Sequence, residues 1–188
     1  FGITMAIKKT SKEEILKESI NLFKIRGYYN TSMANIADAC GLIKGSIYYH
    51  FKSKDEIGLE SLKYIHIHFQ KEIFAIAFRD DLNDNQKIEL FVKKTDDYFL
   101  HSQGGCLLGN LALETTSLNL EFKEEIKAYF ISWENALIKI FENQYSKTEA
   151  LNLAKEYVAL TQGAIMMMNL YDSSENYLKV GEKIISLI

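Results

Sequence analysis

The segment GLIKGSIYYHFKSK, from Gly41 to Lys54, combines an apolar spacing with basic and hydroxyl-bearing side chains. Ile43, Ile47 and Phe51 recur at i, i+4 and i+8, which predicts a short helix with one face turned into a core. The lysine, serine, tyrosine and histidine side chains between them fall on the remaining faces. The segment therefore predicts a helix that packs on one side and offers positive charge and hydrogen-bonding groups on the other.

Two more amphipathic helices are expected before this segment. The first runs from about residue 11 to residue 26 and opens with Ser11 and Glu14, the spacing of a capping box. The second opens at Ser32, and its apolar residues recur at i, i+3, i+4 and i+7. Gly41 then supplies the turn to the third helix. Three short helices, the last two joined by a tight glycine turn, are typical of a helix-turn-helix.

The rest of the chain is also expected to be helical, so we predict an all-α fold. Apolar spacing predicts a long helix over about 55–78, then helices over about 85–101, 106–116, 121–144, 148–170 and 174–188. The 188 residues include no proline, which suits a helix bundle better than a fold rich in turns.

Charge is distributed unevenly along the chain. Residues 1–54 hold nine basic and four acidic residues, a net charge of +5, whereas the remainder holds 13 basic and 21 acidic residues, a net charge of −8. A basic part on an acidic remainder indicates that only the N-terminal part meets a polyanion. Chance variation in solvated faces explains the charge distribution equally well. Whether the N-terminal part binds a polyanion must therefore be judged from its individual residues.

Composition and motifs exclude several classes of protein. Cys40 and Cys106 are too few for a disulfide framework, and no apolar stretch approaches the ~20 residues of a membrane span, so we expect a cytoplasmic protein without membrane association. No GxSxG, GxxxxGK[ST] or HExxH motif occurs, which argues against a small helical enzyme. His66 and His68 are two apart and would face different ways on a helix. We therefore predict no catalytic site, metal site or cofactor.

The third helix carries side chains suited to double-stranded DNA. In a helix-turn-helix the last helix lies in the major groove, and here Lys44, Ser46 and Tyr49 point outward, where they reach base edges. Asn35 of the preceding helix is a further candidate. Gly45 lacks a side chain and permits close approach to the sugar-phosphate chain. Lysines just past the helix are suited to phosphate contacts, which fix register without reading sequence.

The stretch GYYNTSMANIADACGLIKGSIYYHFKSKDEI, after a helix that ends in LFKIRG, resembles the N-terminal DNA-binding domain of TetR/AcrR-type transcriptional repressors. The resemblance covers about residues 12–62 and departs from the family at Ala34, often a charged residue, and at Cys40, usually alanine. It implies a helix-turn-helix DNA-binding domain over residues 5–54. It also implies a larger helical ligand-binding and dimerisation domain over residues 55–188.

The resemblance further implies how such a protein works. A homodimer would place its two third helices in successive major grooves of a palindromic DNA operator. A small molecule bound in the second domain would then splay the heads apart and release the operator. The family's phosphate contacts carry over to Thr31, Ser32, Tyr48, His50 and Lys54, and its groove contacts to Lys44, Gly45, Ser46 and Tyr49.

The second domain carries weaker signals. GGCLLGNLALE, residues 104–114, resembles a segment that opens the helix linking cavity to head in a subset of these repressors, and Cys106 within it is more often a packing residue than a sensor thiol. The helices over 121–144 and 148–170 are the best dimer candidates, and which faces meet the partner stays open. Aromatic and methionine side chains suit an apolar or aromatic ligand, and the candidates are Phe69, Phe99, Tyr129, Trp133, Tyr157 and Met167.

Two hypotheses about function therefore stand beside each other. One is a ligand-responsive transcriptional repressor. The other is a DNA-binding regulator that is controlled by a protein partner or has no small-molecule ligand. Both agree about the first domain and differ about the second.

Overall fold

The computed structural model describes residues 11–115, 117 and 119–188. These residues form α-helices, one 3₁₀ helix and no β-strand, which confirms the predicted all-α fold. Residues 5–10 of the predicted first domain lie outside the described part of the chain. The elements in chain order are α1 (Lys12–Arg26), α2 (Met33–Ala39), α3 (Lys44–His50), α4 (Lys54–Glu72), the 3₁₀ helix η1 (Phe74–Phe78), α5 (Asp84–Leu100), α6 (Leu107–Thr115), α7 (Leu120–Phe141), α8 (Lys147–Tyr171) and α9 (Glu175–Ile185).

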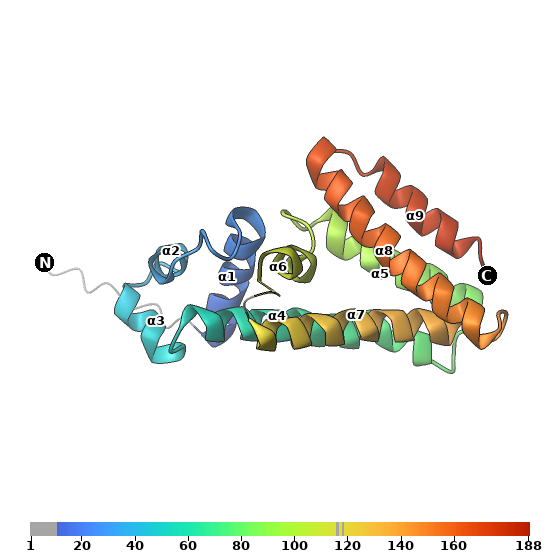
Figure 1. The fold of residues 1–188 in the computed structure, drawn as a ribbon, viewed down its shortest axis with the longest axis horizontal. Coiled ribbons are helices and arrows are strands. Elements are labelled where there is room, and N and C mark those ends of the chain that lie inside the picture. Colours follow the sequence, from blue (N-terminus) through green and yellow to red (C-terminus); the bar gives the residue numbers. More distant parts are fainter. Residues whose placement is uncertain (1–10, 116, 118) are drawn as a thin grey trace, which may run out of the picture.

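The molecule is elongated, with α1, α2 and α3 gathered at one end (Figure 1). We call these three helices the head, and the elements from α4 to α9 the body. Helix α4 leads out of the head and lies alongside α7, whereas α8 and α9 pack on each other at the opposite end. Helix α6 lies on the side of the body that faces α1, and it packs against both α1 and α7. The predicted domain boundary, between residues 54 and 55, falls in the first turn of α4.

Helices α1 and α2 begin where the sequence predicts. The backbone N–H of Glu14 donates to the Ser11 hydroxyl at 3.1 Å, and the Ser11 N–H donates to the Glu14 carboxylate at 2.9 Å. Ser32 and Asn35 form a second capping box at the start of α2. These side chains satisfy backbone N–H groups that the first turn of a helix leaves without partners. Local hydrogen bonding thus fixes where α1 and α2 start.

The prediction that Ile43, Ile47 and Phe51 share the core face of the third helix is only partly correct. Ile47 and Phe51 are buried, but Ile43 is 77% exposed. Ile43 is the N-cap residue, with extended backbone angles of φ −77° and ψ 149°, so it stands before the helix and does not share the face of Ile47. The half-buried Leu42 packs against the core instead. The i, i+4 spacing failed here because only the last two of its three positions follow the start of the helix.

The single long helix predicted over 55–78 is interrupted. Helix α4 ends at Glu72, Ile73 departs from helical angles with φ −123° and ψ −59°, and η1 follows. Ile73, Phe74, Ile76 and Ala77 are all buried. One face of an α-helix cannot bury four of five consecutive residues, whereas a break followed by a tighter turn can. No proline or glycine marks the break, so the sequence carries no local signal for it.

Candidate nucleic-acid interface and ligand-binding region

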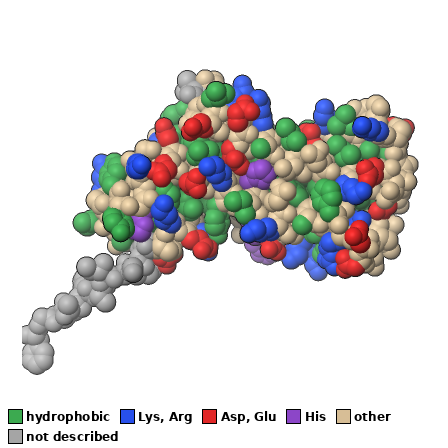
Figure 2. Space-filling view, turned by 90° about the horizontal axis from the view of Figure 1, so that it is seen from below, with side chains coloured by type: hydrophobic (Ala, Val, Ile, Leu, Met, Phe, Trp, Pro, Cys, Tyr) green, Lys and Arg blue, Asp and Glu red, His purple; other side chains and the backbone are tan. Residues whose placement is uncertain are grey.

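Helix α3 lies at the end of the molecule, and its outward side chains form the candidate DNA surface (Figure 1). Lys44 and Gly45 are exposed, and Tyr49 is 88% exposed. Tyr48 is about half exposed, and His50 is half-buried with its ring 5.2 Å from that of Tyr49. Figure 2 shows hydrophobic and basic side chains together with a histidine at this end of the molecule. Positive, hydrogen-bonding and aromatic groups therefore share one surface.

Ile43 also lies at this surface, although its spacing from Ile47 predicts a core position. Its side chain is exposed directly before Lys44. The signal that identifies it is the turn: Gly41 adopts φ +66°, and Leu42 and Ile43 complete the connection before the helix begins. An apolar side chain at this position is suited to the methyl group of thymine.

The candidate residues of α2 are tied to one another. The Ser32 hydroxyl accepts the backbone N–H of Asn35 at 3.2 Å and donates to the Asn35 side-chain oxygen at 2.8 Å. Both residues are at the surface, at the N-terminus of α2. Thr31 is buried, and its hydroxyl donates to the Gly27 carbonyl at 2.8 Å. The structure thus brings Ser32 and Asn35 together and places Thr31 behind them as a support of the turn.

Lys54 lies in the junction between head and body. Its ammonium donates to the Tyr28 carbonyl at 3.0 Å and lies 4.3 Å from the centre of the Tyr28 ring. Burial lowers the pKa of Lys54. Its ammonium is therefore engaged by the turn between α1 and α2, whereas Lys44 and Lys52 are exposed.

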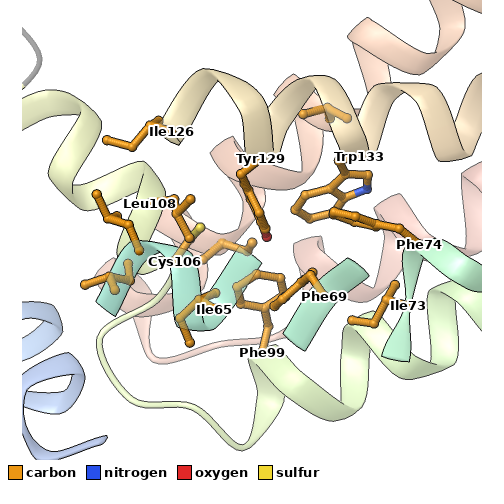
Figure 3. Close-up of a cluster of buried hydrophobic side chains, with 14 of the residues drawn as sticks. Ile65, Phe69, Ile73, Phe74, Phe99, Cys106, Leu108, Ile126, Tyr129 and Trp133 are labelled. Atoms are coloured by element: carbon orange, nitrogen blue, oxygen red, sulfur yellow. The ribbon is translucent and has the colours of Figure 1, made fainter. Parts of the chain in front are cut away.

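Four of the predicted ligand-binding residues form one aromatic cluster in the body (Figure 3). The ring of Phe69 lies 5.8 Å from Phe99, 5.3 Å from Tyr129 and 5.9 Å from Trp133. All four side chains are buried. The Tyr129 hydroxyl is enclosed and has no hydrogen-bond partner in the described part of the chain, and burial raises the pKa of Tyr129 well above its ordinary value. The cluster is apolar with one unpaired donor at its centre.

Tyr157 and Met167, the other two ligand candidates, do not join this cluster. Tyr157 is buried near α9, where the Lys183 ammonium lies 5.8 Å from its ring centre. Met167 is 39% exposed and lines a surface groove between α8 and α9. Helix α8 carries apolar residues on both its buried and its exposed side, so apolar spacing alone does not show which of its residues face the core.

The space beside the aromatic cluster is small. A cavity of about 30 Å³ is lined by residues that include Trp133, Thr161 and Tyr177. That volume holds about one water molecule. Ligand pockets for drug-sized molecules are roughly 300–1,000 Å³, so the space beside this cluster is too small for such a molecule in this state.

Cys106 is a packing residue in this structure. Its side chain is buried, and burial raises the pKa of its thiol. The backbone N–H of Gly109 donates to its sulfur at 3.4 Å. Reactive cysteines are accessible and have a lowered pKa, so the conditions for a redox sensor are not met.

The described residues form neither a membrane-spanning helix nor a metal site. No helix among them combines the length and the apolar character that a bilayer crossing requires. His66 bonds to the Glu125 carboxylate at 2.7 Å and to the Ser132 hydroxyl at 3.1 Å, which joins α4 to α7. No three His, Cys, Asp or Glu side chains in the described ranges come together as metal ligands.

Two protein-family profiles match the chain. Residues 15–60 match the bacterial regulatory proteins of the tetR family, and residues 85–183 match the C-terminal domain of LmrA/YxaF-like transcriptional regulators. The first match falls on α1 to α4 and the second on α5 to α9, so together they span head and body.

Individual proteins that are similar to this chain are also named as transcriptional regulators. The chain is 27% identical over 188 residues to the HTH-type transcriptional regulator YxaF of Bacillus subtilis, a match that covers 98% of each chain. It is 27% identical over 176 residues to the HTH-type transcriptional repressor DhaR of Mycobacterium sp., with 87% of this chain and 85% of that one covered. A crystal structure of a TetR transcriptional regulator from Legionella pneumophila superposes with a TM-score of 0.87 at 25% identity, covering 97% of this chain and all of that one.

These proteins are transcriptional regulators and not enzymes. The C-terminal match alone spans more than half of the chain, and the N-terminal match falls on the helix-turn-helix whose residues suggested DNA. The resemblance of residues 12–62 is thereby confirmed, and the chain belongs to the TetR family of bacterial transcriptional regulators, with a DNA-binding helix-turn-helix head and an LmrA/YxaF-like C-terminal domain.

Proposed function

We propose that this regulator is a repressor that binds a palindromic operator as a homodimer and releases it when a small molecule enters the body. The exposed outer face of α3, with Lys44 and Tyr49, carries the DNA-binding part of the proposal. The name of the similar protein DhaR, a transcriptional repressor, supports repression over activation. A cytoplasmic location follows from the proposed target, chromosomal DNA.

The proposed docking places α3 in the major groove. Lys44, Ser46 and Tyr49 would meet base edges, Ile43 would contact a thymine methyl, and Gly45 would allow the backbone close approach. Ser32, Tyr48 and His50 would contact phosphates beside the groove, and Asn35 would lie near them in the first turn of α2. Thr31 and Lys54 would act from behind, because their polar groups are engaged by the turn between α1 and α2.

The proposed dimer interface uses α8 more than α7. Most large side chains of α7 face the core, whereas α8 exposes apolar side chains along its outer side. A Cβ added to Gly163, in the middle of that side, would have no other atom within 4 Å, so a partner helix has room to approach closely there. Two copies of this face make the self-complementary contact that a twofold dimer needs. The apolar side chains are Leu160, Met166, Met167, Leu170 and Tyr171.

The proposed ligand site is the aromatic cluster around Tyr129. An apolar or aromatic molecule with one hydrogen-bond acceptor would pair with the enclosed Tyr129 hydroxyl, which has no partner within the described residues. The cluster must open before such a molecule can enter, because the adjoining cavity holds about 30 Å³. That closure is the observation that favours the second candidate function, a DNA-binding regulator controlled by a protein partner or with no small-molecule ligand.

One pair of experiments tests the proposal. Selection from a random DNA pool should yield a sequence with twofold symmetry and half-sites about 34–36 Å apart or a multiple of that spacing. Thermal unfolding against a panel of apolar and aromatic compounds should then identify ligands that raise the unfolding temperature and release the DNA. A selected operator with no stabilising compound would favour the second candidate, and no selected sequence would refute both.

A further inference from the structure

Contacts from three body helices converge on Tyr28, in the turn between α1 and α2. Its ring packs edge-on against Phe122 of α7 at 5.3 Å, and its hydroxyl donates to Asp55 of α4. Its carbonyl accepts the Lys54 ammonium at 3.0 Å. Tyr28 is 4% exposed. The turn that leads into α2 is therefore held by the body rather than by the head alone.

Helix α6 contributes a contact of a different kind, from a carboxylate to the backbone. The Glu114 Oε2 atom accepts the N–H of Tyr28 at 2.8 Å and that of Tyr29 at 3.5 Å. These two amides follow the end of α1 and have no acceptor within their own helix. A hydrogen bond to an ionised acceptor is stronger than one between neutral groups. Glu114, the last residue but one of α6, is thus hydrogen-bonded directly to the turn between α1 and α2.

Two glycines provide the room for this approach. A Cβ on Gly27 would lie 3.1 Å from the Glu114 carboxylate, and Gly27 adopts φ +82°. A Cβ on Gly104, just before α6, would lie 2.8 Å from the Lys24 carbonyl of α1. At these two positions the chain around α1 and the chain around α6 therefore approach too closely for a side chain larger than hydrogen.

The other end of α6 reaches the ligand candidates. Leu107, Leu108 and Leu111 are buried, and Figure 3 shows Leu108 and Cys106 beside Tyr129. On the head side, Thr31 bonds to Gly27 and to Tyr28 and directly precedes the cap of α2. One short helix therefore joins the aromatic cluster to the turn from which α2 and α3 continue.

We propose that Glu114 is a positioning residue for operator binding: its carboxylate fixes the turn at Tyr28 to α6 and so sets the orientation of α2 and α3. The inference rests on the proposed function, because it assigns to one contact the transmission of a change in the body to the DNA-reading helix. Removing the carboxylate leaves the head folded by its own core and frees its orientation. We expect a protein whose head is not held in one orientation to bind the operator less tightly than the unsubstituted protein, because binding must first fix that orientation.

The test compares Glu114→Ala with Leu113→Ala, a neighbouring substitution at a side chain that is 89% exposed. Amide hydrogen exchange should become faster over residues 28–51 in Glu114→Ala and stay unchanged in α7 and α8. Affinity for the operator selected with the unsubstituted protein should fall about 3- to 30-fold, the usual range for a single coupling residue. Glu114→Gln keeps a carbonyl acceptor, so its exchange rates and operator affinity should lie between those of Glu114→Ala and the unsubstituted protein. Leu113→Ala should change neither the exchange rates nor the affinity.

The outcomes separate this inference from the proposed function. Unchanged exchange over residues 28–51 and unchanged operator affinity in Glu114→Ala would overturn the inference while leaving the repressor proposal intact. Faster exchange throughout the body would also overturn it, since that marks a general loss of stability. If Glu114→Ala does not fold, Glu114→Asp, whose shorter side chain retracts the carboxylate, is judged by the same criteria. If the unsubstituted protein selects no operator, the proposed function fails, and exchange at Tyr28 and Tyr29 still decides whether Glu114 holds the turn.

Discussion

Lys44 shows how a single position links sequence to the proposed interface. It is the first residue of α3, its side chain is exposed, and it forms no ion pair with any described residue. Lysines elsewhere on the surface, such as Lys17, Lys63 and Lys127, pair with a carboxylate one turn away on their own helix. An exposed cation without a neighbouring carboxylate is available to a phosphate or a guanine edge.

Substitution of Lys44 by alanine should weaken operator binding by about 1–3 kcal/mol if the ammonium reads a base edge. The fold should be unaffected, because an exposed side chain of this kind contributes little to stability. Lys155→Ala, an exposed lysine of α8, is the matched control and should leave binding unchanged. Gel-shift titration with parallel thermal unfolding measures both effects. Equal affinity of the Lys44 and Lys155 variants would remove Lys44 from the interface.

Tyr129 poses the opposite problem, a polar group with no partner in the described residues. A buried unsatisfied hydroxyl costs about 1–3 kcal/mol, so Tyr129→Phe should raise the free energy of unfolding by up to about 1 kcal/mol. Tyr145→Phe is the control, because its hydroxyl donates to the Leu187 carbonyl at 2.8 Å and its loss should lower stability. Urea titration distinguishes the two directions. A destabilised Tyr129→Phe variant would mean that the hydroxyl has a partner, such as a bound water.

At the scale of the helices, the sequence predicted the starts of helices that are set by local hydrogen bonds and apolar spacing. The capping box of Ser11 and the i, i+3, i+4 spacing placed α1 and α2 within a residue or two. The errors occur where tertiary packing or a turn overrides periodicity. Ile43 has the spacing of a core residue but precedes its helix, and the segment after Glu72 buries too many neighbours for one helical face. The glycine turn at Gly41 is the one local signal for the first feature, and the second has none.

Helix α8 leads to the prediction about assembly. Gly163→Glu should convert the proposed dimer to a monomer, because a charge would enter the apolar contact between two copies of α8. The monomer fold should survive, since a side chain at Gly163 extends into open space. Gln70→Glu, which adds the same charge at an exposed position of α4, is the control. Light scattering coupled to size-exclusion chromatography gives the mass of each variant. A dimeric Gly163→Glu protein would place the interface elsewhere.

Over the whole molecule, the resemblance predicted the TetR-type helix-turn-helix, which the family match confirms, but no residue pattern predicted the contact between Glu114 and the turn at Tyr28. The resemblance covered residues 12–62, the family match covers residues 15–60, and which residues of α3 contact DNA stays a prediction. The contact from Glu114 to the turn at Tyr28 spans 86 positions in sequence, and no spacing rule connects residues so far apart. For the same reason, composition names Tyr157 and Met167 as candidate lining residues but does not show that they lie apart from the aromatic cluster.

The uneven charge gives a prediction that only the whole protein can test. A net charge of −3 would make the protein as a whole repel DNA, whereas the +5 of residues 1–54 makes the N-terminal part attract it. Operator affinity should therefore fall steeply with salt, by about 10³–10⁵ between 50 and 200 mM if the dimer makes 6–10 phosphate contacts. Lys52→Ala should reduce the slope of log affinity against log salt by about one for each phosphate that the substitution leaves unpaired. Lys94→Ala, an exposed lysine of α5 in the body, should leave the slope unchanged. A slope near zero for the unsubstituted protein would show that the charge of the head does not act on the operator, and base contacts alone would then have to supply the affinity.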